Sequence, residues 1–323
     1  GEQVIIQGDA RGRVHATIYF YHDSCDEHAP PGSVCASSYW RIQDVTIRGF
    51  NGGDGDSNAV KIDTQHVQVV NSVLCCAGPD VVKIVRTAND AAIVNSEIYS
   101  DPTITTPFAN SQGVDITGAD RVRVVGNNFH DLPDIALYGK GNVREPIFAA
   151  NRIKNTGYDT RDSFAGIMMG QQTDVNRLVD GPYEAYDGLV VNNIIEGTTG
   201  ACIAASSSLN SRFYHNTCVL TALRGSAAIL VSTEGGIDYT PNKGAEFVNN
   251  LIVNDPATPR MIRSTDREYT QPTQPPLTIK SNVYWAGGVA PTFTWIPAFY
   301  QQRGLSEWLA AYLSIYGGVD TST

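Results

Sequence analysis

A short apolar segment that ends in Asn or Gly recurs along most of this 323-residue chain, and this repetition restricts the fold more than any other feature. Internal repeats of nearly constant period are the sequence signature of stacked architectures. The copies occupy residues 45–49, 67–71, 91–95, 122–127, 148–151, 189–193, 213–216, 247–250 and 277–282. A second series of short apolar segments lies between them, at residues 59–63, 81–85, 113–117, 135–138, 166–169, 201–205 and 227–231. The chain therefore consists of a stack of similar turns.

The length of one repeat indicates which stack is formed. Ile62 and Ile84 are 22 residues apart, and Ile116 and Leu137 are 21 residues apart. A strand–helix–strand unit needs about 30 residues, but one turn of a parallel β-solenoid, stacked on the next at about 4.8 Å, fits this period. Such crossovers are right-handed, and a corner Asn tolerates left-handed backbone and can hydrogen-bond to the next turn. We predict an all-β fold, a right-handed parallel β-helix.

An antiparallel sandwich with Asn turns is the alternative fold. It would need Asn-Gly hairpins at intervals of roughly 8–12 residues. The chain contains a single Asn-Gly pair, Asn51-Gly52. This scarcity favours the solenoid.

The ends of a solenoid need caps, because an open end exposes the edges of strands. We predict one domain over residues 1–323, with an N-terminal cap at 1–40, solenoid turns at 41–284 and a C-terminal cap at 285–323. Residues 305–313 have the pattern of a short amphipathic helix that ends before Gly317-Gly318. We expect this helix to form part of the C-terminal cap.

Composition excludes several classes of protein. Hydrophobic residues make up 42% of the chain and charged residues 17%, which excludes a disordered chain. The 23 Lys and Arg against 33 Asp and Glu give a net charge of −10, which is unsuited to a nucleic-acid partner. No apolar run reaches the roughly 18–20 residues of a membrane span. No signal peptide is visible at the N-terminus, and we expect that such a segment has been removed.

Six cysteines bear on the compartment. Cys25 and Cys35 flank a Pro-Pro-Gly loop, which predicts a small disulfide loop in an exported protein, whereas six reduced thiols are the alternative. The adjacent Cys75 and Cys76 end an apolar segment, so at least one of them is expected in the core. No pair of CxxC motifs is present, which argues against zinc. We predict a secreted or periplasmic monomer.

Charged residues alternate with the apolar residues of the second series. If Val60, Ile62, Val82 and Ile84 point inward, then Lys61 and Lys83 point outward, and Asp115 stacks beside them in the next turn. The neighbouring outward column is expected to hold Asp63, Val85, Thr117 and Tyr138. Further polar side chains of this surface are Arg86, Lys140, Gln171 and Gln172. Together they predict a local cationic groove, although ordinary solvated charges on an exposed sheet are the alternative.

Such a groove suits an acidic polysaccharide. β-Elimination at a uronate needs a cation on the carboxylate, a base for the C5 proton and an acid for the leaving oxygen. Lys83 is the first candidate for the base, because Lys61 one turn away would lower its pKa by repulsion. Lys61 and Arg86 are expected to bind carboxylate, and Tyr138 or Lys140 would be the acid.

Two further clusters lie in turns. His130, beside Asp131, is a second candidate for the base, although a turn His next to Asp is more often structural. Tyr158 and Arg161 lie near the longest insertions and are expected to contact sugar rings and acid groups. Asp54, Asp56 and Asn58 have the alternate oxygen ligands of a calcium loop, but Gln65 replaces the Glu of the full pattern, and a Gly-rich turn is the alternative.

The segments 113–116, 125–131 and 136–141 resemble the secreted β-helix proteins of the pectate-lyase-like superfamily, and the resemblance extends over residues 41–284. It implies cleavage or epimerisation of acidic polysaccharides, often with calcium, and calcium is the one ion we expect; no organic cofactor is expected. The Asp clusters that hold calcium in pectate lyases and the Asn-Lys-Ser strand of alginate and chondroitin lyases are absent, and Lys83-Ile84-Val85-Arg86 is a loose counterpart of the latter. Because this fold carries several activities, the resemblance does not select one of them.

Three hypotheses follow. The first is an exported lyase that cleaves a uronate polymer, and a uronan C5-epimerase shares its proton abstraction. The second is a glycoside hydrolase, which needs two carboxylates about 5–9.5 Å apart, with Asp63 and Asp115 as the candidate pair. The third is a non-catalytic glycan-binding or adhesin module. All three have an acidic polysaccharide or oligosaccharide as partner.

Overall fold

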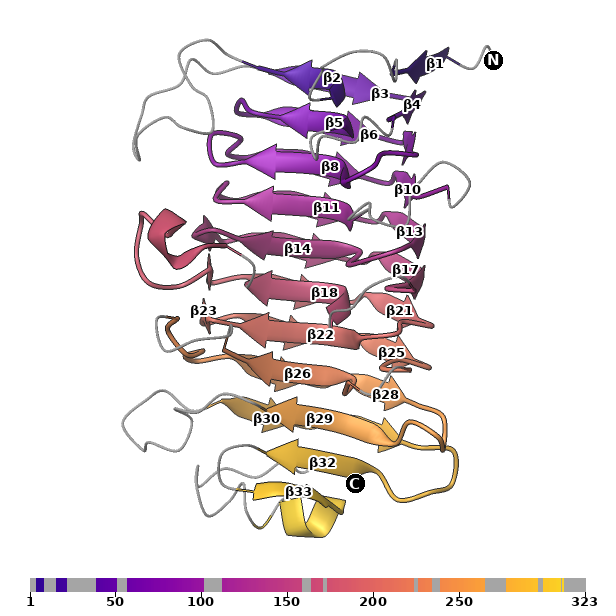
Figure 1. Cartoon of the computed structure of the whole chain (residues 1–323), viewed down its shortest axis with the longest axis vertical. Helices are drawn as coiled ribbons and strands as arrows, with labels where there is room; N and C mark the ends of the chain where they lie inside the picture. Colours follow the sequence, from indigo (N-terminus) through magenta and orange to yellow (C-terminus); the bar gives the residue numbers. More distant parts are fainter. Residues whose placement is uncertain are drawn as a thin grey trace.

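The computed structural model of the chain shows one elongated stack of strands, with the N-terminus at one end and the C-terminus at the other (Figure 1). It describes residues 4–8, 16–21, 39–50, 57–101, 112–158, 164–170, 173–223, 226–233, 239–264, 277–295, 299–308 and 310. Apart from one pair at the C-terminal end, all paired strands in these ranges run parallel. The predicted parallel β-helix is confirmed.

Three long sheets form the faces of the helix. Sheet 1 contains β2 (Ala16–Phe20), β5 (Asn58–Ile62), β8 (Asp80–Val85), β11 (Gln112–Thr117), β14 (Leu137–Lys140), β18 (Phe164–Gly170), β22 (Ala201–Ser206), β26 (Ile229–Ser232), β29 (Arg260–Ser264), β32 (Thr292–Trp295) and β33 (Phe299–Arg303). Sheet 2 contains β3 (Trp40–Gln43), β6 (Val67–Val70), β9 (Ala92–Val94), β12 (Arg123–Val125), β16 (Ile147–Ala149), β20 (Leu189–Val191), β24 (Arg212–Tyr214), β27 (Glu246–Val248) and β30 (Thr278–Lys280). Sheet 3 contains β1 (Val4–Gln7), β4 (Val45–Arg48), β7 (Val73–Cys75), β10 (Glu97–Tyr99), β13 (Asn128–Leu132), β17 (Arg152–Thr156), β21 (Ile194–Glu196), β25 (Thr217–Val219), β28 (Leu251–Val253) and β31 (Val283–Trp285).

Smaller elements complete the chain. The short strands β15 (Val143–Arg144), β19 (Ala185–Tyr186) and β23 (Ser208–Leu209) form a fourth small sheet, and Val175–Arg177 is a single 3-10 turn. β1 and β2 already pair in register with β4 and β5, so stacking begins within the segment expected to be the N-terminal cap.

The core consists of columns of identical or similar side chains, because parallel strands in register place one residue above the next. In sheet 3, Ile47 pairs with Leu74, Leu74 with Ile98, and Ile98 with Phe129, and all four are fully buried. In sheet 2, the rings of Phe213 and Phe247 stack with their centroids 4.5 Å apart. Each new turn thus covers the apolar edge that the preceding turn leaves open.

Buried asparagines line the corner between sheets 2 and 3. They are Asn127, Asn151, Asn193, Asn216, Asn250 and Asn282. Each interior member donates to a backbone carbonyl and to the next Asn, as Asn193 does to the carbonyl of Phe148 at 3.0 Å and to Asn216 Oδ1 at 2.9 Å. The residue before each of them has a left-handed φ, for example Asn192 at 57° and His215 at 55°. Two successive residues therefore divide the turning and the hydrogen bonding that we assigned to one corner Asn.

The C-terminal end is closed differently from the rest. β33 pairs antiparallel with β32, which ends the parallel stacking. Residues 305–308 and 310 are helical, and the buried Trp308 packs on Phe293 with ring centroids 5.1 Å apart. The predicted short helix is confirmed over these residues, and it covers the last turn of the core.

The structure contains two disulfides among the described residues. Cys202 on β22 is bonded to Cys218 on β25, which ties sheet 1 to sheet 3, and Cys75 is bonded to its neighbour Cys76. All four cysteines are buried, as expected for Cys75 and Cys76. The predicted Cys25–Cys35 loop lies outside the described residues. Disulfides form and persist in oxidising compartments, so these two are consistent with an exported protein.

Candidate active site

The outward column predicted on sheet 1 is present. Lys61 pairs with Lys83, and Lys83 pairs with Asp115, in neighbouring strands β5, β8 and β11. Tyr138 on β14 continues this same column beside Asp115, whereas Thr117 pairs with Lys140. The expectation that Tyr138 lies in the neighbouring column is therefore wrong. The reason is that Leu137 stacks on Val114 and not on Ile116, so this turn has 23 residues between stacked positions instead of the 21 that separate Ile116 from Leu137.

Asp115 is the centre of an ionic network on this surface. Lys83 Nζ is bonded to Asp115 Oδ2 and lies 3.6 Å from Asp80 Oδ2, and Lys140 Nζ lies 3.3 Å from Asp115 Oδ2. Thr117 donates its hydroxyl to Asp115 Oδ1 at 3.1 Å. Two ammonium groups from β8 and β14 thus meet at one carboxylate on β11.

Tyr138 joins this network to a second chain of hydrogen bonds. Lys140 Nζ donates to Tyr138 Oη at 2.9 Å, and Tyr138 donates to Gln112 Oε1. Gln112 Nε2 in turn donates to Asp134 Oδ2 at 2.9 Å. Tyr138 is fully buried, while the side chains of Lys83 and Lys140 keep 19% and 13% of their surface exposed. A ligand on this surface therefore reaches the two lysines and not the phenol.

The two aspartates beside Lys83 have pKa values shifted in opposite directions. Burial raises the pKa of Asp80 to about 6, although attraction to Lys83 opposes this shift. Burial also acts to raise the pKa of Asp115, but Lys140 and Lys83 outweigh it and lower the pKa to about 2. At neutral pH Asp115 is therefore a fixed negative charge, and Asp80 titrates close to neutrality.

Lys83 holds its proton firmly. Burial acts to lower its pKa, but attraction to Asp115 and Asp80 outweighs burial and raises the pKa above the ordinary value. A general base needs the opposite shift, and the lowering that we expected from Lys61 is not found. Burial, together with Asp115 and Asp80, also raises the pKa of Tyr138 well above its ordinary value.

The sequence analysis missed four side chains of this region. Asp80 lies three residues before Lys83 at the start of β8, and the alternation of a strand would place their side chains on opposite faces, so no signal in the sequence indicates their contact. Gln112 begins β11 and Asp134 lies in the turn between β13 and β14, so the alternation within a strand indicates neither of them. Glu184 is fully buried and accepts hydrogen bonds from the amides of Gly141 at 2.7 Å and Thr173 at 3.0 Å, which fixes the backbone next to Lys140.

The other residues predicted for this surface make contacts outside the network around Asp115 or lie outside the described residues. Lys61 is buried, with Nζ 5.4 Å from the centre of the Tyr19 ring. Arg86 Nη2 lies 3.4 Å from the carbonyl oxygen of Arg177. Asp63, the expected partner of Asp115 in a hydrolase, accepts instead from Tyr19 Oη at 2.9 Å and from Thr87. Arg161, Gln171 and Gln172 lie outside the described residues.

His130 belongs to another face of the molecule. It lies on β13 in sheet 3, with Nδ1 2.8 Å from Asp131 Oδ2, Nε2 3.0 Å from Glu97 Oε1 and its ring stacked on Tyr99. Tyr158 Oη donates to the carbonyl of Asp131 at 3.5 Å. Every contact of His130 in the described ranges is thus within sheet 3, and the structure does not bring it to Lys83.

The predicted calcium loop is described only at its last residue. Asn58 begins β5, is buried, and donates to the backbone carbonyl of Asp80 at 2.9 Å. Asp54 and Asp56 lie outside the described residues. Within the described part of the chain, no group of three His, Cys, Asp or Glu side chains is arranged to hold a metal ion.

Comparisons with known proteins give structural neighbours and no family. No family model and no curated protein matches the chain. The fold is similar to the crystal structure of an alginate lyase from Paenibacillus sp. str. FPU-7, with a TM-score of 0.48 and 12% identity over 80% of this chain and 88% of that one. It is also similar to a mannuronic acid specific polysaccharide family 6 lyase from human gut microbiota, with a TM-score of 0.42 and 11% identity over 94% of this chain and 74% of that one. Both likenesses concern the course of the backbone.

In the described ranges, no helix has the length and hydropathy of a membrane-crossing segment.

Proposed function

We propose that this chain is an exported lyase that cleaves a uronate-containing polysaccharide by β-elimination on the outward face of β8, β11 and β14. One observation carries the proposal. The ammonium groups of Lys83 and Lys140 meet at Asp115 and stay partly exposed, on a protein whose net charge is −10. Asp115 and the ionised Asp80 offset the two positive charges, and the exposed parts of the two ammonium groups can still donate hydrogen bonds to the carboxylate of a bound sugar.

The pKa directions suggest how the residues divide the reaction. Lys83, whose pKa is raised, would neutralise the substrate carboxylate and so acidify the C5 proton. Asp80, with its pKa at about 6, would be largely ionised at neutral pH and would accept that proton. As the C4–O bond breaks and the C4–C5 double bond forms, Lys140 would protonate the leaving oxygen. Tyr138 would orient Lys140 through their 2.9 Å hydrogen bond.

The test measures the ultraviolet absorbance of the unsaturated product. Purified protein is incubated with alginate, polygalacturonate, glucuronan, hyaluronan and chondroitin, each with added calcium and with a chelator. We expect a rise on one polymer, and the chelator tests the predicted calcium requirement separately. No rise on any of these polymers would contradict the proposal.

A pair of matched variants connects the activity to this site. Lys83→Met removes the charge and keeps the length of the side chain, and we expect a loss of at least about 100-fold in kcat/KM. Lys280→Met makes the same change at an exposed position on β30, and we expect the rate to be unchanged. Circular dichroism shows whether both variants keep the β-helix. A folded Lys83→Met variant with the full rate would refute the assignment.

A glycoside hydrolase is the second candidate, and the opposite pKa shifts of Asp80 and Asp115 favour it. Both carboxylates contact Lys83, and pairs of carboxyls whose pKa values are pushed apart are typical of acid and base partners. Asp80 would be the acid and Asp115 the base. Such an enzyme releases reducing ends without the rise in ultraviolet absorbance. A C5-epimerase would exchange the C5 proton with heavy water without cleavage, and a glycan-binding module would retain the polymer without turnover.

A further inference from the structure

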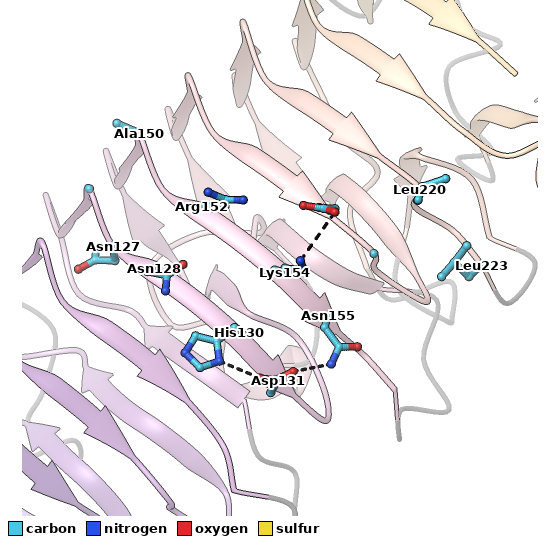
Figure 2. Close-up of a pocket in the computed structure, with 13 residues that line it drawn as sticks. Asn127, Asn128, His130, Asp131, Ala150, Arg152, Lys154, Asn155, Leu220 and Leu223 are labelled. Atoms are coloured by element: carbon cyan, nitrogen blue, oxygen red, sulfur yellow. Dashed lines mark hydrogen bonds and ion pairs between the residues drawn. The ribbon is translucent and has the colours of Figure 1, made fainter. Parts of the chain in front are cut away.

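A groove lies on sheet 3, away from the lysine pair. It has a volume of about 910 Å³ and is formed on the outward side of β13, β17 and β21 (Figure 2). A volume in this range is typical of small-molecule sites of about 300–1,000 Å³, so the groove is large enough for several sugar rings. No residue that lines it belongs to the network around Asp115.

Register explains how its polar floor is built. Asn128 on β13 pairs with Arg152 on β17, and His130 pairs with Lys154. Lys154 pairs in turn with Glu196 on β21. Because these residues alternate with the buried core residues of their strands, their side chains all point to the same outward face. Figure 2 shows Asn128, His130, Arg152 and Lys154 side by side along this face.

Most of the charges on the floor are paired within the groove. Asp131 is bonded to His130 and to Asn155, and Lys154 Nζ lies 4.0 Å from Glu196 Oε1. Arg152 is exposed, and its guanidinium has no ion pair among the residues that the structure describes. One positive charge with bidentate hydrogen-bonding capacity is thus left open to an anion.

The opposite wall is apolar. Leu220 and Leu223, from the turn after β25, line the groove with 41% and 44% of their surface exposed. Leu220 has a φ of 51°, a backbone conformation that costs a bulky side chain roughly 1 kcal/mol. A pyranose ring presents a C–H face to such a wall and its polar groups to the floor.

We propose that this groove is a second, non-catalytic binding site for carboxylated oligosaccharides, with Arg152 as the residue that binds the sugar carboxylate. The choice of uronates as the ligand rests on the proposed function, whereas the existence of an anion site rests on the groove itself. The site would hold a neighbouring stretch of polymer on sheet 3 while the lysine pair on sheet 1 engages another.

The test measures retardation in native gels that contain alginate, polygalacturonate or hyaluronan, with dextran as the neutral polymer. All proteins carry Lys83→Met, which prevents turnover. Arg152→Ala is compared with Arg212→Ala, which removes the same charge from an exposed position on β24. We expect Arg152→Ala to weaken binding to a uronate polymer at least about tenfold and Arg212→Ala to leave it unchanged. Arg152→Lys should give an intermediate affinity, since it keeps the charge and loses the bidentate geometry.

The results distinguish this inference from the lyase proposal. Equal affinities of the Arg152→Ala and Arg212→Ala proteins, equal retardation by dextran, or no retardation by any uronate polymer would each overturn the second site. If the wild-type protein shows no turnover on any polymer while the Lys83→Met protein binds a uronate polymer through Arg152, the lyase proposal is refuted and the second site stands.

Discussion

The asparagine column gives the sharpest prediction for stability. Asn193→Ala removes four hydrogen bonds from the buried corner between sheets 2 and 3: two donated by its amide, to Phe148 and to Asn216, and two that its oxygen accepts from Asn151. A buried hydrogen bond contributes about 1 kcal/mol net, and more where a partner is left unsatisfied. We therefore expect the free energy of unfolding to fall by about 4 kcal/mol.

The end of the column provides a graded comparison. The side chain of Asn282 makes three such bonds, one donated to Phe247 and two accepted from Asn250. Asn282→Ala should therefore cost about 1 kcal/mol less than Asn193→Ala. Gln68→Ala, on the exposed surface of β6, is the control and should change stability by less than about 0.5 kcal/mol.

Urea unfolding followed by tryptophan fluorescence and by circular dichroism measures these differences. Coincident curves from the two probes and an unchanged m value show that one cooperative transition is compared throughout. If Asn193→Ala lowered the free energy of unfolding by less than about 1 kcal/mol with the same m value, the column would not hold the turns together, and the reasoning would be refuted.

Three further predictions concern the residues around Lys83 and Lys140 and the disulfide. The pKa of Asp80 is raised from 3.8 to about 6 in the folded state, so the folded protein binds the extra proton between these values. Thermal unfolding should then show that the wild type loses up to about 3 kcal/mol of stability relative to Asp80→Asn as the pH rises from 4 to 7. A stability difference between the two proteins that stays constant over this pH range would contradict the prediction. Replacing Cys202 and Cys218 together by Ala opens a bridge between residues 16 apart and should cost about 3 kcal/mol in urea unfolding, whereas a loss below 1 kcal/mol would argue that the bridge is absent in solution. Glu184→Gln keeps an oxygen that can accept from the Gly141 amide but replaces the oxygen that accepts from Thr173. If Glu184 positions Lys140, kcat should fall by a larger factor than KM changes. An unchanged kcat would show that Glu184 does not have this role.

The architecture was largely predictable because repetition and alternation are local properties of the chain. Apolar residues at a period near 22 sufficed to predict stacked parallel turns, and the alternation around Val60 and Val82 placed Lys61 and Lys83 on one outward column. The side chain of a strand residue points in or out according to its position alone, so a neighbour one turn away follows once the period is known.

The position of Tyr138 and the partners of Asp115 were not predictable in the same way. The prediction placed Tyr138 one column away because it paired Leu137 with Ile116, whereas Leu137 pairs with Val114. The number of residues in the turn before β14 does not determine which of these two pairings forms. Lys140 reaches Asp115 only because β14 stacks on β11 in this register.

The sequence by itself therefore determined the repeat, the class of fold and the outward direction of the charged residues, since each depends on spacing within a few residues. The tertiary structure alone decided the protonation of the site. Lys83 lies between Asp80 and Asp115, and their attraction outweighs the burial that would lower its pKa. It also decided that His130 and Arg152 belong to a separate groove on sheet 3, because only the closed turns of the helix assign each strand to a face.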